Sequence, residues 1–200
     1  IKGGKGPLLV VDADANSNLN EVLGGEAGVS LGQIREEIAQ AELRGDTIPK
    51  SMTKADYAEY RFESALAEED DFDMLVMGRT QGKGCYCYVN GVLKTLLDKY
   101  IGAYRYVVID NEAGMEHIAR GTLPHVDALL LVSDCSRRGV QAVARIAEMV
   151  RELDLKPGLM KLIINRAPGG VLSDGVREEI EAHHLELAGV LPQDDAVYEA

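Results

Sequence analysis

The stretch YVVIDNEAG, residues 106–114, indicates the fold class of this 200-residue chain. Its apolar run, Tyr106–Ile109, ends in Asp110, and a turn containing Gly114 follows. Short runs that are apolar on both faces are typical of strands buried in a parallel sheet. Five further runs share this form: Leu8–Val11, Met74–Met77, Ala128–Val132, Met160–Ile164 and Leu185–Leu191.

Helical patterns lie between these strands. Apolar residues recur at helical spacing in the segments that begin at Leu31, after Thr53 and after Ser136. Thr53 and Ser136 are residue types that commonly cap a helix. Alternating strands and helices predict an α/β fold, a doubly wound and mostly parallel sheet with helices on both faces. No linker or repeat interrupts the pattern, so we expect residues 1–200 to form a single domain.

Composition narrows the function classes. Hydrophobic residues make up 46% and charged residues 27% of the chain, which is typical of a globular protein. The net charge of -12 argues against a nucleic-acid partner and against docking on an anionic membrane. Three cysteines are too few for a disulfide scaffold, and no apolar run could span a bilayer. We therefore expect a cytoplasmic protein.

Polar side chains follow the strand runs Leu8–Val11 and Tyr106–Ile109. Parallel sheets bind ligands at the carboxyl ends of their strands. The segment DADANSN, residues 12–18, offers Asp12, Asp14 and Asn16. These groups can hold Mg²⁺ through water and orient a water beside a phosphate. The alternative is a turn that caps a helix at Asn18. Asp110 stands where a carboxylate reaches the water shell of Mg²⁺, and Gly114 would let the backbone approach a phosphate.

Asn165 and Arg166 end a later strand run. An amide side chain offers both a donor and an acceptor, so Asn165 can read the edge of a purine base. The segment Pro192–Asp195 follows the last strand and could line the same pocket.

Cys85 and Cys87 form a Cys-x-Cys motif after a glycine-rich turn. Two thiols this close cannot readily bridge each other, and two sulfurs are half of a closed soft-metal site. Lys83 and the positive end of a helix expected over Val89–Tyr100 favour the thiolate form. The motif therefore predicts a metal site shared by two copies of the chain, and the alternative is a pair of buried free cysteines.

Four segments together carry a resemblance to a known family: residues 11–19, 77–79, 84–90 and 108–117. The chain resembles the CooC-type ATPases that mature nickel carbon monoxide dehydrogenase, in the MinD/ParA and nitrogenase iron-protein class of P-loop proteins. The resemblance implies that Asp14 activates the attacking water, that Asp12 and Asp110 serve the magnesium site, and that Gly114 lies in switch II. It also implies that Asn165 contacts adenine and that Cys85 and Cys87 bind Ni²⁺ or Zn²⁺ between two subunits.

The implied function is ATP-dependent nickel insertion, with ATP/ADP and Mg²⁺ as cofactors, a homodimer joined through the metal, and carbon monoxide dehydrogenase as client. Three alternatives to this function remain open: a MinD/ParA-type partitioning or positioning ATPase, a reductase like the nitrogenase iron protein, and a non-enzymatic metal-binding dimer.

The family begins with a strand and a deviant Walker A loop, Gly-Lys-Gly-Gly-x-Gly-Lys-Thr. Residues 1–7, IKGGKGP, resemble this loop only superficially, because Pro7 leads into a strand instead of a helix. We therefore expect the domain to lack its first strand and helix and to be truncated at both ends. Without P-loop amides and lysine to grip phosphate, these 200 residues alone should neither bind ATP tightly nor hydrolyse it.

Overall fold

A computed structural model describes residues 6–25, 28–44, 51–79, 86–112 and 126–199. The chain divides into two compact units, residues 1–113 and 114–200, and each unit has its own sheet and core. The single domain expected over residues 1–200 stays a prediction.

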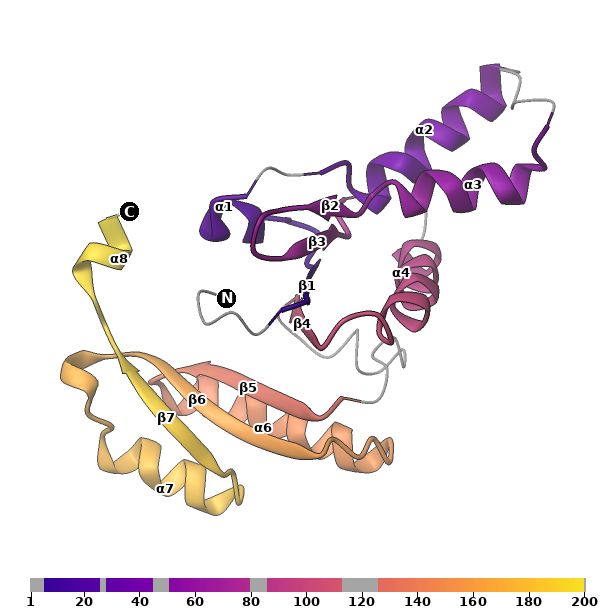
Figure 1. Ribbon diagram of the computed structural model, residues 1–200. Coiled ribbons are helices and arrows are strands. Elements are labelled where there is room, and N and C mark those ends of the chain that lie inside the picture. Colours follow the sequence, from indigo (N-terminus) through magenta and orange to yellow (C-terminus); the bar gives the residue numbers. More distant parts are fainter. Residues whose placement is uncertain (1–5, 26–27, 45–50, 80–85, 113–125, 200) are drawn as a thin grey trace. The chain divides into compact units, whose positions relative to one another are not determined.

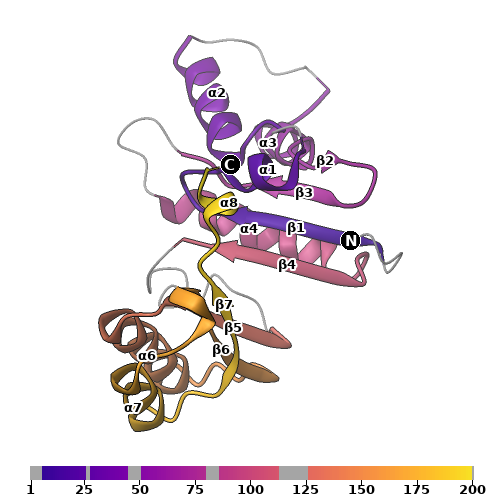
Figure 2. The same ribbon diagram turned by 90° about the vertical axis from the view of Figure 1, so that its left-hand side faces the viewer.

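The sheet of the first unit has four strands in the order β2-β3-β1-β4 (Figure 1). The central strand β1 pairs in parallel with β3 and with β4, and lies between them in Figure 2. The short edge strand β2 runs antiparallel to β3. The strands are β1 (Leu8–Ala13), β2 (Ala67–Glu68), β3 (Asp73–Val76) and β4 (Tyr106–Asn111). Because β1 is apolar on both faces and paired on both edges, it is buried from Leu9 to Ala13.

Four described helices belong to this unit: α1 (Leu19–Leu23), α2 (Leu31–Arg44), α3 (Lys54–Glu63) and α4 (Tyr86–Tyr100). Thr53 caps α3 as predicted, because its hydroxyl accepts from Asp56 N at 3.1 Å and Asp56 accepts from Thr53 N at 3.2 Å. Helix α4 begins at Tyr86, earlier than the expected start at Val89. Cys87 therefore lies in the first turn of a helix and not in a loop.

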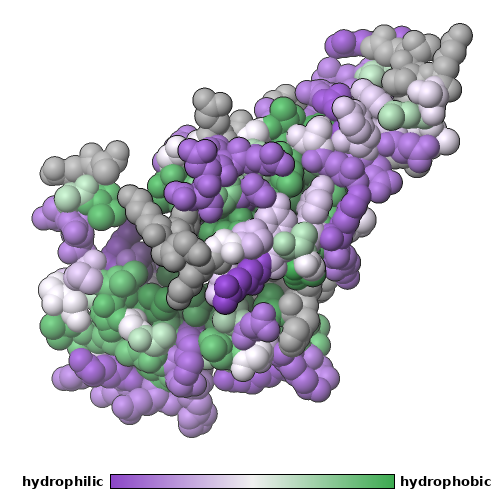
Figure 3. Space-filling model, viewed as in Figure 1, coloured by the Kyte–Doolittle hydropathy of each residue, from purple (hydrophilic) through white to green (hydrophobic). Residues whose placement is uncertain are grey.

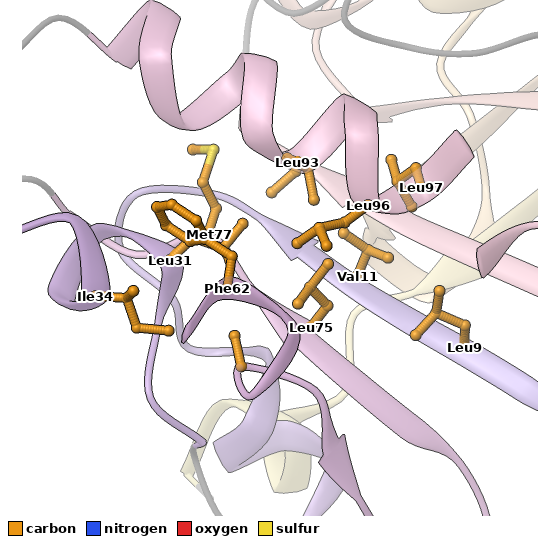
Figure 4. Close-up of a cluster of buried hydrophobic side chains, with 12 residues drawn as sticks. Leu9, Val11, Leu31, Ile34, Phe62, Leu75, Met77, Leu93, Leu96 and Leu97 are labelled. Carbon is orange, nitrogen blue, oxygen red and sulfur yellow. The ribbon is translucent and has the colours of Figure 1, made fainter. Parts of the chain in front are cut away.

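Apolar side chains cover both faces of the first sheet. On one face, Leu93, Leu96 and Leu97 of α4 point toward β1 and β3, where Val11 and Leu75 lie (Figure 4). On the other face, Leu19 and Leu23 of α1 pack against Val10, Met74 and Val76. Helices thus lie on both sides of a mostly parallel sheet, and the predicted α/β fold is confirmed.

The second unit contains a three-stranded sheet in the order β5-β6-β7, and its strands are all parallel. Its elements are β5 (Ala128–Asp134), α6 (Arg137–Glu152), β6 (Leu159–Ala167), the 3-10 turn η1 (Pro168–Gly170), α7 (Asp174–Ala182), β7 (Leu187–Pro192) and α8 (Asp195–Glu199). Ser136 caps α6 as predicted by accepting from Gly139 N at 3.0 Å. The periodic face of α6 packs Val140 and Ala147 against Leu162 and Ile164 of β6.

A buried carboxylate links α6 to α7. Glu179 accepts from Gln141 Nε2 at 2.9 Å and from Arg137 Nε at 3.1 Å, and His183 Nε2 lies 3.2 Å from it. The hydrogen bond from Gln141 holds the pKa of Glu179 below its usual range, and Arg137 and His183 act in the same direction. The network therefore stabilises this helix pair through the ionised form of Glu179.

The face of the second sheet opposite α6 is apolar and exposed. Leu130, Val132 and Leu191 are each exposed there, and hydrophobic surface gathers over β5–β7 in Figure 3. None of the described helices is long and apolar enough to cross a membrane.

Candidate functional site

Two aspartates meet at the carboxyl end of the first sheet. Residues paired in a parallel ladder lie side by side, and the register of β1 and β4 pairs Asp12 with Asp110. Side chains alternate across a strand, so Asp12 shares its sheet face with Val10, which packs toward α1. Asp12 is 1% exposed, whereas Asp110 is exposed. The pairing brings together two of the predicted magnesium-site residues.

The loop after β1 is organised around the Asp12 carboxylate. Its Oδ1 accepts from Asp14 N at 3.0 Å, and its Oδ2 accepts from Leu19 N at 3.1 Å. Leu19 is the first residue of α1, and the Asn18 side chain makes no capping hydrogen bond. Asp12 therefore satisfies a helix amide that an N-cap side chain would otherwise satisfy. The alternative prediction for this segment is a turn that caps a helix at Asn18. The turn does cap α1, but the capping side chain is that of Asp12 and not that of Asn18.

Asp14 and Asn16 lie in the same loop. Asp14 is partly buried, and its Oδ1 accepts from Asn16 N at 2.8 Å, while its carbonyl accepts from Ser17 Oγ at 3.0 Å. Ser17 adopts a left-handed conformation with φ of 51°, which completes the turn. The loop thus presents a carboxylate, Asp14, from a hydrogen-bonded turn directly after the strand that carries Asp12.

The electrostatics of this sheet end favour a cation. Although Asp110 as a residue is exposed, partial desolvation of its carboxyl group raises its pKa above the usual range, and the negative charges of Asp12 and Asp14 raise it further. A divalent cation would relieve this repulsion, and carboxylate oxygen is the ligand type that Mg²⁺ prefers. Within the described residues no three His, Cys, Asp or Glu side chains are arranged to enclose a metal ion. The donor set fits an ion that keeps several waters and completes its shell with phosphate, as Mg²⁺ usually does.

A residue that sequence reasoning gave no role also reaches this loop. The Arg79 guanidinium, after β3, donates a hydrogen bond to Asn16 Oδ1. Two features of the sequence point to this segment: residues 77–79 carry part of the family resemblance, and Gly78, just before Arg79, has a φ of 67° that favours glycine.

In the second unit, Asn165 and Arg166 lie at the end of β6 as predicted. The register pairs Asn165 with Asp134 of β5, and Asn165 Oδ1 accepts from Arg166 N at 2.9 Å. Arg166 is left-handed with φ of 56°. Hydrogen bonds from Ser136 hold the pKa of Asp134 below its usual range, and the charge of Arg166 adds to that effect. The strand ends of this unit therefore carry a small polar cluster with an amide at its centre.

The remaining predicted site residues are not described. Cys85 and Gly114 lie outside the described residues, and Cys87 is placed only by the backbone of α4, without its side chain. The catalytic, nucleotide-binding and metal-binding roles expected for all nine site residues stay predictions.

Comparison with known proteins agrees with the fold. No family model matches the chain. The uncharacterized ATP-binding protein MJ0685 of Methanocaldococcus jannaschii is 40% identical over 194 residues, which cover 96% of this chain and 75% of that protein. The carbon monoxide dehydrogenase accessory protein CooC of Rhodospirillum rubrum is 27% identical over 207 residues, with the same two coverages.

Among solved structures, the septum site-determining protein MinD of Pyrococcus horikoshii, complexed with Mg-ADP, matches with a TM-score of 0.64 and 18% identity. The match covers 98% of this chain and 72% of that one, and at this identity it shows the fold. The fold is therefore that of MinD. Identity of 40% over nearly the whole chain also shows the family, and this chain belongs to the family of ATP-binding proteins that includes MJ0685.

Proposed function

We propose that this protein binds ATP with Mg²⁺ and hydrolyses it, as an ATPase of the MinD/ParA class. The observation that carries the proposal is the pairing of Asp12 with Asp110 at the end of a parallel sheet, where burial and neighbouring charges raise the pKa of Asp110. Membership of a family of ATP-binding proteins supports the nucleotide, and the Mg-ADP complex of the similar MinD supports the ion.

In this proposal Asp12 and Asp110 hold Mg²⁺ through its water shell, and the ion supplies positive charge against the phosphates. Asp14 accepts the proton of the attacking water and orients that water for in-line attack on the terminal phosphate. The turn that fixes Asp14 through Asn16 and Ser17 keeps the carboxylate from rotating away. From the family resemblance we also propose that the Asn165 amide, in the second unit, offers hydrogen bonds to an adenine base, with Arg166 next to it in the sequence.

The finer proposal is a role in maturing a nickel enzyme. CooC of Rhodospirillum rubrum is named as a carbon monoxide dehydrogenase accessory protein, and this chain carries the Cys-x-Cys motif Cys85 and Cys87. We propose that the two thiolates bind Ni²⁺ or Zn²⁺ together with those of a second copy, and that nucleotide turnover controls the dimer. The client would be a carbon monoxide dehydrogenase. The alternative, a MinD/ParA-type positioning ATPase, is disfavoured by the net charge of -12, which suits neither DNA nor anionic lipid.

ATP hydrolysis by the native gene product, expressed from its complete coding sequence, tests the general proposal. We expect Mg²⁺-dependent turnover, and we expect Asp14→Asn to lower kcat by roughly 100-fold or more, the usual contribution of a general base. Asp71→Asn, in the exposed turn between β2 and β3, is the matched control and should keep full activity. A native product without Mg²⁺-dependent hydrolysis would refute the proposed function.

Equilibrium dialysis against Ni²⁺ and Zn²⁺ tests the metal. Replacing Cys85 and Cys87 together by Ser should abolish uptake and metal-dependent dimerisation, while the matched Cys135→Ser variant should keep both. Unchanged uptake by the double variant would show that the metal assignment is wrong. Co-sedimentation with anionic vesicles or DNA would instead favour the positioning ATPase.

A further inference from the structure

The contact between Arg79 and the loop that carries Asp14 joins segments far apart in the sequence. The Arg79 guanidinium donates to Asn16 Oδ1, and both side chains are exposed. Asn16 N in turn donates to Asp14 Oδ1 at 2.8 Å. Arg79 is therefore connected to the Asp14 carboxylate through one intermediate residue.

The backbone beneath Arg79 is tightly fixed to β1. Met77 N donates to Asp12 O at 2.8 Å, so the end of β3 remains joined to the end of β1. Gly32 N, in the first turn of α2, donates to Met77 O at 2.9 Å. These two hydrogen bonds tie the loop before Arg79 to a strand on one side and to a helix on the other.

Close packing fixes the same loop from the α2 side. A Cβ at Gly32 would lie 2.3 Å from Arg79 O, and a Cβ at Gly78 would lie 2.2 Å from Ser30 Oγ. Ser30 itself is fixed, because Ser30 N donates to Gln33 Oε1 at 2.9 Å and Gln33 N donates to Ser30 Oγ at 3.2 Å. Close packing at Gly32 and Gly78, where a side chain would clash, therefore fixes the backbone position of Arg79.

The loop that receives the guanidinium is held less firmly. Apart from Asp12, its described hydrogen bonds are made by Asp14, Asn16 and Ser17 with one another and with Arg79. Ser17 is left-handed, a conformation that costs free energy in a residue with a Cβ. An added contact from a rigid neighbour restricts such a loop more than another contact within the loop would.

We propose that Arg79 is a positioning residue for Asp14. From its fixed base it holds the Asn16 side chain, and Asn16 holds the Asp14 carboxylate in the orientation that hydrolysis needs. A guanidinium suits this role because it stays charged at all working pH values and its planar fork fixes the direction of the bond. The inference rests on the proposed ATPase function, in which Asp14 acts on the attacking water.

Hydrogen–deuterium exchange tests the contact without requiring turnover. In Arg79→Ala we expect the amides of Asp14 and Asn16 to exchange roughly two- to tenfold faster, the effect of losing one hydrogen bond. Arg79→Lys, which keeps a donor, should recover part of the protection. The matched control is Arg105→Ala, at the start of β4, where the guanidinium lies 5.5 Å from the Tyr106 ring centre. That variant should leave both amides unchanged.

Steady-state kinetics of ATP hydrolysis by the native gene product tests the role. Arg79→Ala should lower kcat by the same roughly two- to tenfold factor with KM nearly unchanged, because the contact orients Asp14 and does not hold substrate. Asn16→Ala, which keeps its backbone amide, should give a similar loss, and the double variant should lose no more than either single variant.

The outcomes separate this inference from the proposed function. Unchanged exchange in Arg79→Ala, or losses in kcat that multiply in the double variant, would overturn the positioning role. Faster exchange with unaltered kcat would overturn it as well. A native gene product without Mg²⁺-dependent hydrolysis overturns the proposed function instead, and the exchange data then still report whether Arg79 restrains the loop.

Discussion

Replacing Asp110 by Asn should stabilise the protein at neutral pH. Asp110 sits beside Asp12 on the neighbouring strand, and burial together with the charges of Asp12 and Asp14 raises its pKa. Asn has nearly the same shape as Asp but no charge, so the substitution removes the repulsion and leaves the packing. A carboxylate that lowers the stability of the fold is expected to serve a function instead, such as binding a cation.

The size of the gain follows from the ladder geometry. Neighbouring strands lie about 4.8 Å apart. Two carboxylates about 5 Å apart repel by about 1 kcal/mol at the dielectric constant of water and by about 3 kcal/mol at an effective constant near 20. Because Asp110 is exposed, the screened value applies, and we expect about 1 kcal/mol. For a chain of this length that raises Tm by about 2–4 °C.

The pH dependence has a definite sign. A carboxyl whose pKa is raised on folding binds more protons in the native state than in the unfolded state, so stability falls as pH rises from the ordinary aspartate value through the raised value. Above that window the whole penalty is present, and below it the penalty is absent. Asp110→Asn should therefore melt higher than wild type at pH 7.5, and the difference should shrink below about pH 4, the ordinary aspartate range.

Thermal melts with and without Mg²⁺ complete the assay. The ion should stabilise wild type more than Asp110→Asn, because it neutralises the charge that the variant lacks. Asp71→Asn, which removes an exposed carboxylate of the same unit, should change Tm little under either condition. A lower Tm for Asp110→Asn at pH 7.5, or a gain that persists undiminished at acidic pH, would refute the reasoning.

Three further predictions follow from the fold. Alanine in place of a helical glycine usually stabilises, and Gly91→Ala should gain about 0.5–1 kcal/mol in urea denaturation because its Cβ meets nothing within 4 Å. Gly32→Ala should instead destabilise, since its Cβ would lie 2.3 Å from a backbone oxygen; a gain at both sites would contradict the packing. Asp12→Ala should cost about 2–3 kcal/mol in the same assay by orphaning two backbone amides, and a cost near zero would show that those bonds contribute nothing. Because the pKa of Glu179 is lowered, the stability that its ionised form contributes should be lost as pH falls through that lowered value. Glu179→Gln should therefore lower Tm at pH 7 and match wild type in strong acid. An equal deficit in Tm at both pH values would contradict the ionised network.

The longer elements could be predicted because their signals are local. Apolar runs placed all three strands of the second sheet, and helical spacing placed α2, α3 and α6. The edge strand β2 has only two residues, too few for any period, so the sequence marks its antiparallel partner β3 as a strand but not β2 itself. The start of α4 was placed too late because the glycines before Cys85 suggest a loop, whereas the backbone is helical from Tyr86.

The site could be predicted only residue by residue. That Asp12 and Asp110 end strands is visible in the sequence, but that they are neighbours depends on the strand order β3-β1-β4. The contact of Arg79 with Asn16 depends on the same order, because β3 and β1 are adjacent and end together. Strand order is decided by the packing of the whole sheet and not by any one segment, so pairs of this kind stay hidden until the fold is known.

The position of Asp12 explains why one residue suits both interpretations of residues 12–18, a magnesium site and a helix-capping turn. A carboxylate offers about four lone-pair sites, and the two backbone amides on Asp12 occupy only part of them. The remaining sites can still accept from the water shell of a cation that lies toward Asp110. The same side chain can therefore fix the loop that carries Asp14 and take part in the proposed magnesium site. Helix capping and cation binding are not competing roles here, because the hydrogen bonds that fix the loop also fix the carboxylate that the ion would meet.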